Sequence, residues 1–550
     1  MSESRTTDTS IHFKTWPNEQ GFQPNYEQKT PVQLQVTGVI PAYTAGVLYR
    51  TGPGQYKVDT ENGNTFQVSH WFDGFSHTHR FELVGTDSGV QVFYNSRAAT
   101  DDLIEEVRKT GSLNHFSFGQ KRDPCKTMFR KVQSSYEPRN PASISNVGVT
   151  LSVNMPGLEG KFSATVQERG RYDSVTSLWA KTDTSKFKKI HPETLEPIGL
   201  AQQKDLHPDL DGPLAASHAK SDPKTGDVYN YNISFAPQPT YRVFCVSAAT
   251  GETSILATFS ATPAYLHSLF LTEDYVIVCV WNAHLSPKEL ANGALIEAVQ
   301  PFDDSKPAKW YIVDRKYGKG LIATYDSRAF FCFHSINAWQ EPSPTDSSKI
   351  DIVAECVMFE TSDVLHRLYY DLLVSSSASA QQNSMKRHFS DSKITRFRLP
   401  SIPATPIVDE TKIASVEWAA NETPPLELPT LNPAYLTRPH RYTYAVVGQG
   451  KSTFLDGIIK FDSETKESLF WDEHAQSPGE PIFVADPEGE TEDAGVLLSV
   501  VLDGLTGRSH LLCLDAKTLT ETGRAQVNGP IGFGFHGQHV PTRGVPTGDF

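Results

Sequence analysis

Along most of the chain, short stretches rich in β-branched and aromatic residues alternate with turns rich in Asp, Gly, Ser and Thr. Pairs of such stretches around a polar turn predict antiparallel β-hairpins. Eight hairpins are predicted in this way, at residues 57–68, 82–95, 217–233, 241–259, 310–325, 457–471, 482–501 and 511–527. Many hairpins with few helices predict an all-β protein, a propeller or a sandwich, and the repetition favours the propeller.

Three long stretches without this pattern interrupt the hairpins, at residues 154–181, 282–309 and 375–393. Loops of this length on a rigid scaffold usually cover or form a binding site. Residues 286–299 predict a helix, because Ser286 can cap its N-terminus and Glu289 follows three residues later. No Pro/Ser-rich linker divides the chain, so we expect a polar lead-in at residues 1–33 and a single domain at residues 34–550.

Composition narrows the class of protein. The 550 residues include 64 acidic and 50 basic side chains, and the formal net charge of −14 argues against nucleic acid as a partner. The 6 cysteines are scattered without a Cys-x-x-Cys pair, as in reduced intracellular proteins. The N-terminus lacks an apolar signal segment, and the longest apolar run, residues 275–281, is far too short to span a bilayer. We expect a cytoplasmic protein that lies at most on the surface of an internal membrane or lipid droplet.

Four histidines share one local context, in or beside a β-rich run and next to small or apolar residues. They are His218 in AASHAK, His267 in AYLHSLFL, His334 in FCFHSINAW and His536 in GFGFHGQH. One helix cannot join residues so far apart, whereas the blades of a propeller direct their innermost strands toward one axis. Four imidazoles there would suit Zn, Cu, Ni or Fe(II). A histidine in an apolar strand is more often a hydrogen-bonded core residue, so both interpretations stay open at this point. His70, His77 and His79 form a weaker second candidate cluster.

Several motifs resemble those of the carotenoid cleavage oxygenases and follow the order found in that family. They are LYRTGPGQYKV (48–58), HWFDGFSHTHRFEL (70–83), RDPCKTMF (122–129), FHSINAWQE (333–341), GEPIFV (479–484), FHG (535–537) and the four histidine contexts. The resemblance implies a seven-bladed β-propeller with a helical and loop cap. It also implies a non-haem Fe(2+), held by His218, His267, His334 and His536, with O2 as co-substrate.

The resemblance further implies three carboxylates that accept a hydrogen bond from the outer N–H of an iron ligand. Such partners fix the tautomer of a ligating histidine. Glu480 in GEPIFV and Glu427 in LELPTLN match the family's positions. At the third position Asp183 stands where the family usually has Glu. The resemblance therefore assigns Asp183 to this position, and because Asp is one methylene shorter, a contact through water or a different alignment stays open as an alternative.

The resemblance implies a long apolar polyene as the small-molecule partner, so an apolar tunnel is expected. Its candidate lining residues are Phe116, Phe333, Phe533 and Phe535, with ordinary core packing as the alternative for each. A substrate dissolved in lipid needs an apolar entrance at a membrane surface, for which the stretches 125–129 and 290–302 are candidates. Cys125 aligns with a cysteine that carries a lipid in some animal relatives, and we expect a buried thiol here.

Within the family, carotenoid cleavage, stilbene cleavage and retinoid ester isomerisation are the possible activities. The FHSINAWQE motif and residues 146–150 look closer to cleavage enzymes than to the isomerase. Thr182 and Phe116 stand where stilbene-cleaving members have Lys and Tyr, so a phenol would find no buried polar partner. Lys181 and Lys186 lie close enough to keep the stilbene alternative open.

We therefore predict a dioxygenase that splits one conjugated C=C bond of a carotenoid or apocarotenoid, such as torulene, into two aldehydes. The alternative from another class is a non-catalytic propeller that serves as an interaction scaffold. No obligate protein partner is expected. Which double bond is cut depends on the depth of the tunnel, which the sequence does not determine.

Overall fold

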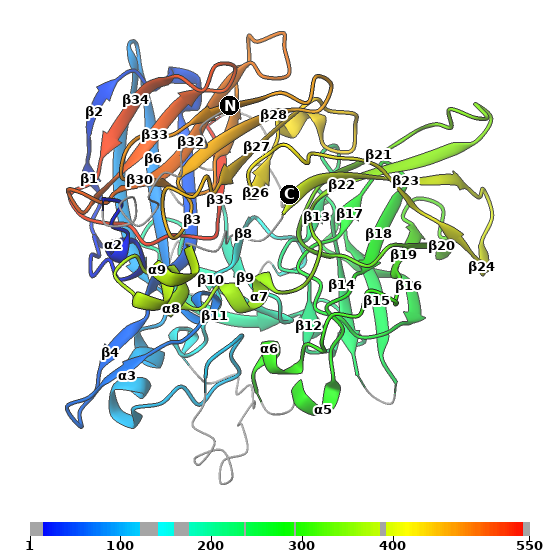
Figure 1. The fold of residues 1–550 in the computed structure, drawn as a ribbon, viewed down its shortest axis with the longest axis horizontal. Coiled ribbons are helices and arrows are strands. Elements are labelled where there is room, and N and C mark those ends of the chain that lie inside the picture. The colour runs from blue at the N-terminus through cyan, green and yellow to red at the C-terminus, as the bar shows by residue number, and fades with distance from the viewer. Residues whose placement is uncertain are drawn as a thin grey trace, which may run out of the picture.

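A computed structural model describes residues 15–121, 141–158, 175–235, 238–290, 293–384 and 392–542. Seven β-sheets are arranged around a common axis (Figure 1). The expected seven-bladed β-propeller is confirmed. All eight predicted hairpins are present as antiparallel strand pairs.

Both ends of the chain contribute to the first blade. In sheet order its strands are β1 (Val32–Gln33), β7 (Gly89–Ala98), β6 (Phe75–Thr86), β3 (Gly46–Gln55) and β35 (His536–Pro541). The second blade contains β11 (Pro197–Gln202), β10 (Lys186–Ile190), β9 (Leu178–Lys181) and β8 (Thr150–Val153). Antiparallel pairing of β3 with β35 closes the ring of blades.

The third and fourth blades follow along the chain. The third contains β16 (Thr253–Ser260), β15 (Thr240–Val246) and β14 (Val228–Ser234), with β12 (Leu214–Ala215) and β13 (Lys220–Ser221) both paired to β14. The fourth contains β24 (Ile407–Ile413), β20 (Leu321–Ser327), β19 (Ala308–Asp314), β18 (Tyr275–Val280) and β17 (Phe270–Leu271).

Three further blades complete the propeller. The fifth contains β25 (Ser415–Ala419), β23 (Lys393–Ile402), β22 (Ile350–Phe359) and β21 (Phe331–Pro342). The sixth contains β29 (Ser468–Trp471), β28 (Gly457–Asp462), β27 (Tyr442–Val447) and β26 (Leu426–Thr430). The seventh contains β2 (Gln35–Gly38), β34 (Glu521–Gln526), β33 (Arg508–Asp515) and β32 (Gly495–Asp503), with β30 (Gln476–Pro478) and β31 (Ile482–Ala485) both paired to β32. A separate hairpin consists of β4 (Lys57–Asp59) and β5 (Thr65–Gln67).

Short helices gather in the lower half of Figure 1, where several of them cover one end of the propeller. They are α2 (Glu19–Phe22), α3 (Asp101–Thr110), α5 (Pro287–Leu290), α6 (Leu295–Ala298), α7 (Val364–Arg367), α8 (Tyr370–Leu373) and α9 (Ala378–Ser384). The 3-10 turns are Ala42–Thr44, Trp71–Asp73, Ala142–Ile144, Gln203–Asp205 and Pro433–Tyr435. Among the described residues, no helix is long and apolar enough to cross a membrane.

The prediction of one helix over residues 286–299 is wrong. Two single-turn helices, α5 and α6, stand there instead. Between them Gly293 has a φ of 91°, a left-handed conformation that breaks a right-handed helix. The backbone N–H of Glu289 does reach the Ser286 hydroxyl at 3.4 Å, so the predicted cap contact forms around one turn only.

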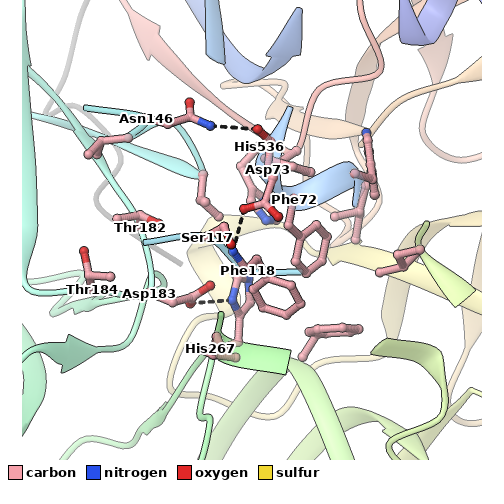
Figure 2. Close-up of a pocket in the computed structure, with 18 of the residues that line it drawn as sticks. Phe72, Asp73, Ser117, Phe118, Asn146, Thr182, Asp183, Thr184, His267 and His536 are labelled. Carbon is pink, nitrogen blue, oxygen red and sulfur yellow. Dashed lines mark hydrogen bonds and ion pairs between the residues drawn. The ribbon is translucent and has the colours of Figure 1, made fainter. Parts of the chain in front are cut away.

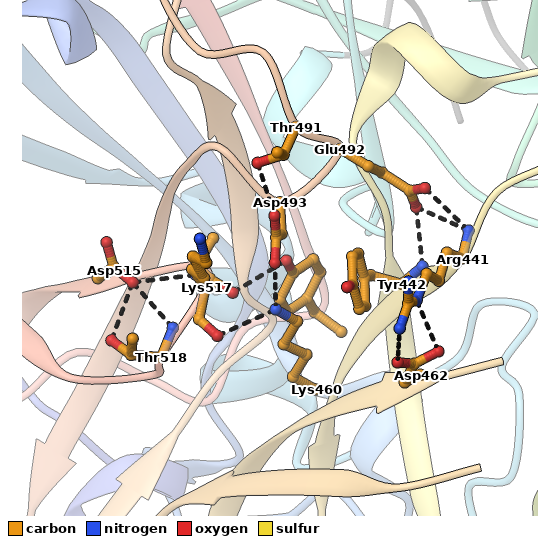
Figure 3. Close-up of polar contacts among 12 residues, drawn as sticks. Arg441, Tyr442, Lys460, Asp462, Thr491, Glu492, Asp493, Asp515, Lys517 and Thr518 are labelled. Carbon is orange, nitrogen blue, oxygen red and sulfur yellow. Dashed lines mark hydrogen bonds and ion pairs between the residues drawn. The ribbon is translucent and has the colours of Figure 1, made fainter. Parts of the chain in front are cut away.

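The described part of the lead-in, from residue 15 onward, packs into the propeller. Trp16 and Phe22 are buried, and Asn18 hydrogen-bonds to Leu373 O and Thr453 Oγ1. Neighbouring blades are joined by polar contacts at their outer parts, as Figure 3 shows for the sixth and seventh blades. There Lys460 of β28 pairs with Asp493 at 2.7 Å and donates to Lys517 O at 3.0 Å.

Candidate metal centre

Four histidines lie at the axis because four different blades end or bend there. His218 lies between β12 and β13, His267 precedes β17, His334 is inside β21 and His536 opens β35. Backbone bonding fixes this arrangement, since His218 N donates to His267 O at 3.1 Å. The convergence predicted from the sequence contexts is present: one ligand nitrogen from each histidine lies within 4.8 Å of all the others.

The imidazoles present their Nε2 atoms to a shared point. Nε2 of His536 lies 3.0 Å from Nε2 of His218 and 3.3 Å from Nε2 of His334. Burial, reinforced by the neighbouring imidazoles, lowers the pKa of His218 and of His536 well below the ordinary value of 6.5. Both rings are therefore neutral at physiological pH, which is the form of histidine that binds metals.

Three carboxylates hold the outer nitrogens of three of these rings. His267 Nδ1 lies 2.7 Å from Asp183 Oδ1, His334 Nδ1 2.5 Å from Glu427 Oε2, and His536 Nδ1 2.7 Å from Glu480 Oε1. A carboxylate accepts a hydrogen bond, so each Nδ1 carries the proton and each Nε2 keeps its lone pair free. This donor set, with four imidazole nitrogens close together and three of them fixed as acceptors, fits a divalent transition metal.

Asp183 contacts its histidine directly, as the resemblance implied, so neither a water-mediated contact nor a different alignment is needed. Asp183 lies in the loop between β9 and β10, and its backbone O accepts from Ala215 N at 3.1 Å. The loop thereby brings the shorter side chain to His267 (Figure 2). Tyr265 supplies a second donor, since its hydroxyl lies 3.1 Å from Asp183 Oδ2 and 3.2 Å from His267 Nδ1.

Sequence reasoning missed Tyr265 and Arg50. Tyr265 precedes His267 by two residues, the spacing that places side chains on one face of an extended segment, and this signal could have identified it. Arg50 of β3 donates to Glu480 Oε2 at 2.9 Å, and Gly537 N donates to the same oxygen at 2.8 Å. Burial raises the pKa of Glu480 to about 7, and the Arg50 guanidinium opposes that rise. No local pattern links Arg50 to Glu480, because the two lie on different blades.

The second candidate cluster does not form a metal site within the described part of the chain, where the four axial histidines are the group found. Nε2 of His70 hydrogen-bonds to Leu365 O at 2.9 Å, and Nδ1 of His79 to Tyr94 Oη at 2.9 Å. The rings of His77 and His79 stack 4.6 Å apart. These residues belong to the polar core of the first blade and its neighbourhood.

The histidine cluster lies between two cavities. One, of about 220 Å³, runs beneath the cap and reaches His267, His334 and His536. The other, of about 710 Å³, follows the propeller interior on the far side and reaches His218, His334 and His536. The first is lined mainly by apolar side chains, and Figure 2 shows Phe72 and Phe118 among them.

Three of the four predicted tunnel residues, Phe116, Phe333 and Phe535, line the cap-side cavity. Phe533 is a correction, because its ring packs against Phe22 and Phe454 with centroids 4.9 and 5.0 Å away. Phe454 does line the cavity, so Phe533 stands behind it in the core. Residues 531–534 are not a strand, so side-chain alternation does not carry Phe533 to the same surface as Phe535.

Of the two predicted entrance segments, residues 125–129 with Cys125 lie outside the described residues. The second segment, 290–302, is partly described, and its Leu295 lines the cap-side cavity. The described part of this stretch therefore lies at the cavity, beside Ser117, whose backbone O accepts from Leu295 N.

Comparison with known proteins identifies the family. A family model described as retinal pigment epithelial membrane protein (RPE65) matches residues 21–541. The chain is 41% identical to a Neurospora crassa protein named carotenoid dioxygenase, over 96% of this chain and 92% of that protein. It is 39% identical to a Fusarium fujikuroi protein named torulene dioxygenase, over 96% and 94%. The chain belongs to the RPE65/carotenoid oxygenase family.

A solved structure supports the fold independently. Cobalt-substituted apocarotenoid oxygenase from Synechocystis matches with a TM-score of 0.71 at 21% identity, over 96% of this chain and 99% of that one. This structural match shows the propeller fold and no more, because the sequence identity is low. Family membership and the four-histidine cluster together indicate a metal site at the propeller axis.

Proposed function

We propose that the protein is an Fe(2+)-dependent dioxygenase that uses O2 to split one conjugated C=C bond of a carotenoid or apocarotenoid into two aldehydes. The observation that carries this proposal is a cluster of four imidazoles, three of them backed by carboxylates, that opens onto a mainly apolar cavity. The names of the fungal relatives, carotenoid dioxygenase and torulene dioxygenase, support the same reaction class.

Each part of the site has a role in this proposal. His218, His267, His334 and His536 would hold the iron, and bound iron supplies the redox chemistry that activates O2. Asp183, Glu427 and Glu480 keep the Nδ1 protons in place and offset the buried positive charge. Phe116, Phe333 and Phe535 line the cavity, orient the polyene and exclude water. No protein nucleophile or general base is required.

The two alternatives are a non-catalytic scaffold and a stilbene-cleaving enzyme. A non-catalytic scaffold has no use for four imidazoles buried around one point, three of them held by carboxylates at their outer nitrogens. Stilbene cleavage is disfavoured at the two positions considered in the sequence, because Phe116 and Thr182 both line the cavity and provide neither a phenol hydroxyl nor an amine. Lys186 lies on the same cavity wall, so a hydroxystilbene belongs among the substrates to be tested.

The polyene substrate also bears on location. We propose that the protein works in the cytoplasm and contacts an internal membrane or lipid droplet, because a carotenoid is dissolved in lipid and must be extracted from it. Neither a protein partner nor a nucleic acid is needed for the reaction. Flotation of the purified chain with carotenoid-loaded vesicles tests the membrane contact.

The central experiment combines metal analysis with product analysis. Iron-loaded protein is expected to hold one iron per chain and to give aldehydes from a carotenoid panel. His267→Ala should lose iron and turnover, whereas His474→Ala, at an exposed histidine outside both cavities, should retain them. Full iron content and turnover in His267→Ala would overturn the proposal. Cleavage of a hydroxystilbene alone would replace it with the stilbene alternative.

A further inference from the structure

The wall of the cap-side cavity between β9 and β10 carries polar side chains that the metal centre does not use. Thr182, Thr184 and Lys186 all line the cavity, around the Asp183 carboxylate. Figure 2 shows Thr182 and Thr184 near Asp183, on the side away from His267. A cavity meant for a pure hydrocarbon gains nothing from such groups, because polar atoms lose water there without replacing its hydrogen bonds.

Three other polar side chains of this cavity, those of Asp73, Asn146 and Ser392, are bonded to the protein. Asp73 accepts from Phe118 N at 2.5 Å and from Gly119 N at 2.7 Å. The amide of Asn146 donates to Asp73 O and Gly74 O. The hydroxyl of Ser392 donates to Leu426 O at 2.7 Å. These groups have structural roles and are not available to a ligand.

Thr184 and Lys186 differ from them. The Thr184 hydroxyl is buried and has no hydrogen-bond partner. The Lys186 side chain is half-buried, and its ammonium forms no hydrogen bond or ion pair within the described structure. Burial lowers the pKa of Lys186, with no acidic neighbour to raise it. Lys188, two residues further along β10, shows the usual solution for a buried amine, since it donates to Ala99 O at 2.6 Å.

The two unpaired groups lie near the metal centre. Lys186 opens β10, and Asp183, bonded to His267, precedes it by three residues. Three residues of chain span at most about 10 Å. A rod-shaped molecule in the cavity can therefore contact this wall with one end while its conjugated chain passes the histidines.

We propose that Thr184 and Lys186 form a subsite for the oxygen-bearing end, a carboxylate or carbonyl, of an apocarotenoid. This inference rests on the proposed function and specifies its substrate class. A carboxylate would satisfy the Lys186 ammonium with a charge-assisted hydrogen bond, and the Thr184 hydroxyl would donate to the same group. A hydrocarbon carotene leaves both groups unpaired in an apolar cavity, so the enzyme discriminates against it.

Binding and turnover of matched substrates test the subsite. The probes are an apocarotenoic acid, the corresponding apocarotenal and a hydrocarbon polyene with the same conjugated length. Binding is measured on the full-length iron-loaded chain without O2, by quenching of tryptophan fluorescence, since Trp71 lines the cavity. Turnover is then measured in air, with kcat and KM determined separately.

Lys186→Met is expected to weaken binding of the acid by about 10- to 100-fold, mainly through KM, because a charged hydrogen bond is lost. Thr184→Val is expected to weaken it by about 3- to 10-fold. Lys186→Arg should retain most of the affinity, because the charge is kept. Binding of the hydrocarbon should be unchanged or tighter in Lys186→Met. Lys517→Met, at an exposed lysine outside the cavity, controls for the change in net charge.

Equal effects of Lys186→Met on the acid and on the hydrocarbon would overturn the subsite and leave the proposed function intact. So would a wild-type enzyme that cleaves both with the same kcat/KM. Failure of the wild type to cleave any polyene would instead count against the proposed function. A hydroxystilbene that binds in a Lys186-dependent way and is cleaved in preference to the acid would overturn the apocarotenoid assignment.

Discussion

Removing the charge of Asp183 while keeping its shape tests the second layer of the metal centre most directly. In Asp183→Asn the side chain still reaches His267 Nδ1, which lies 2.7 Å from Asp183 Oδ1. The carboxylate offers two oxygens to two donors, His267 and Tyr265. An amide offers one oxygen only, so one of the two donors must face the NH2 group.

The expected loss of metal affinity follows from the competition of His267 and Tyr265 for the single amide oxygen. When Tyr265 takes the amide oxygen, the NH2 group faces His267 Nδ1 and favours the tautomer with a proton on Nε2, which cannot bind a metal. Loss of such a partner typically costs about 10–100-fold in metal affinity, or about 1.4–2.7 kcal/mol. We expect the upper part of this range for Asp183→Asn.

Tyr265→Phe provides the matched comparison. It removes the competing donor and leaves the His267–Asp183 contact in place, so metal affinity should fall only a few-fold. The double variant Asp183→Asn, Tyr265→Phe should lose less affinity than the two single variants together, because the amide oxygen is then free for His267. Contacting residues commonly show such non-additivity, of about 0.5–3 kcal/mol.

Anaerobic competition of Fe(2+) or Co(2+) with a chelator measures the affinity, and near-UV circular dichroism verifies that each variant is folded. Metal affinity in Asp183→Asn within about twofold of the wild type would refute the reasoning. If the losses of metal affinity in Asp183→Asn and Tyr265→Phe simply add in the double variant, the proposed competition for the single oxygen is refuted, even where Asp183→Asn alone shows the expected loss.

Three further predictions concern groups outside the metal centre. Burial lowers the pKa of Lys188 from 10.5 to about 7, so between these values the folded state binds fewer protons than the unfolded state and stability rises with pH. Lys188→Met should flatten that rise, which urea unfolding at about pH 7 and about pH 9.5 measures, and an unchanged slope would contradict the assignment. Phe533→Ala should cost about 3–5 kcal/mol of stability and leave substrate preference unchanged, because the ring packs in the core. Phe116→Ala, at a half-buried cavity residue, should raise KM for the polyene with a smaller loss of stability. A raised KM in Phe533→Ala together with an unchanged KM in Phe116→Ala would contradict these assignments.

The fold was predictable because its unit is local. Each predicted hairpin is a contiguous segment whose two β-rich runs and polar turn lie within about 20 residues, and each forms as expected. The pairing of hairpins into blades is not local. For example, β35 near the C-terminal end shares a sheet with β1 and β3 near the N-terminal end. The helix at 286–299 was overpredicted because the pattern did not reveal the left-handed backbone of Gly293.

The residues of the site that lie in recognisable sequence motifs were predictable. The four histidines, Glu427 and Glu480 could be identified from their sequence contexts, and they take the expected positions relative to one another. Arg50 could not be identified, since its contact with Glu480 joins residues 430 positions apart through packing of the first and seventh blades. Phe533 was assigned to the wrong surface, because an irregular segment has no periodicity to follow.

Asp183 shows why a motif position must be considered together with its surroundings. A shorter acid in a fixed frame would leave a gap of one methylene and a weakened hydrogen bond to His267. Here the loop between β9 and β10 delivers Asp183 to its histidine, and the Tyr265 hydroxyl occupies the second carboxylate oxygen. An Asp at this position is therefore compatible with an intact centre, because the loop supplies the reach that the shorter side chain lacks. It follows that Asp183→Glu should crowd Tyr265 and displace one of the two contacts, although it restores the residue that the family usually carries.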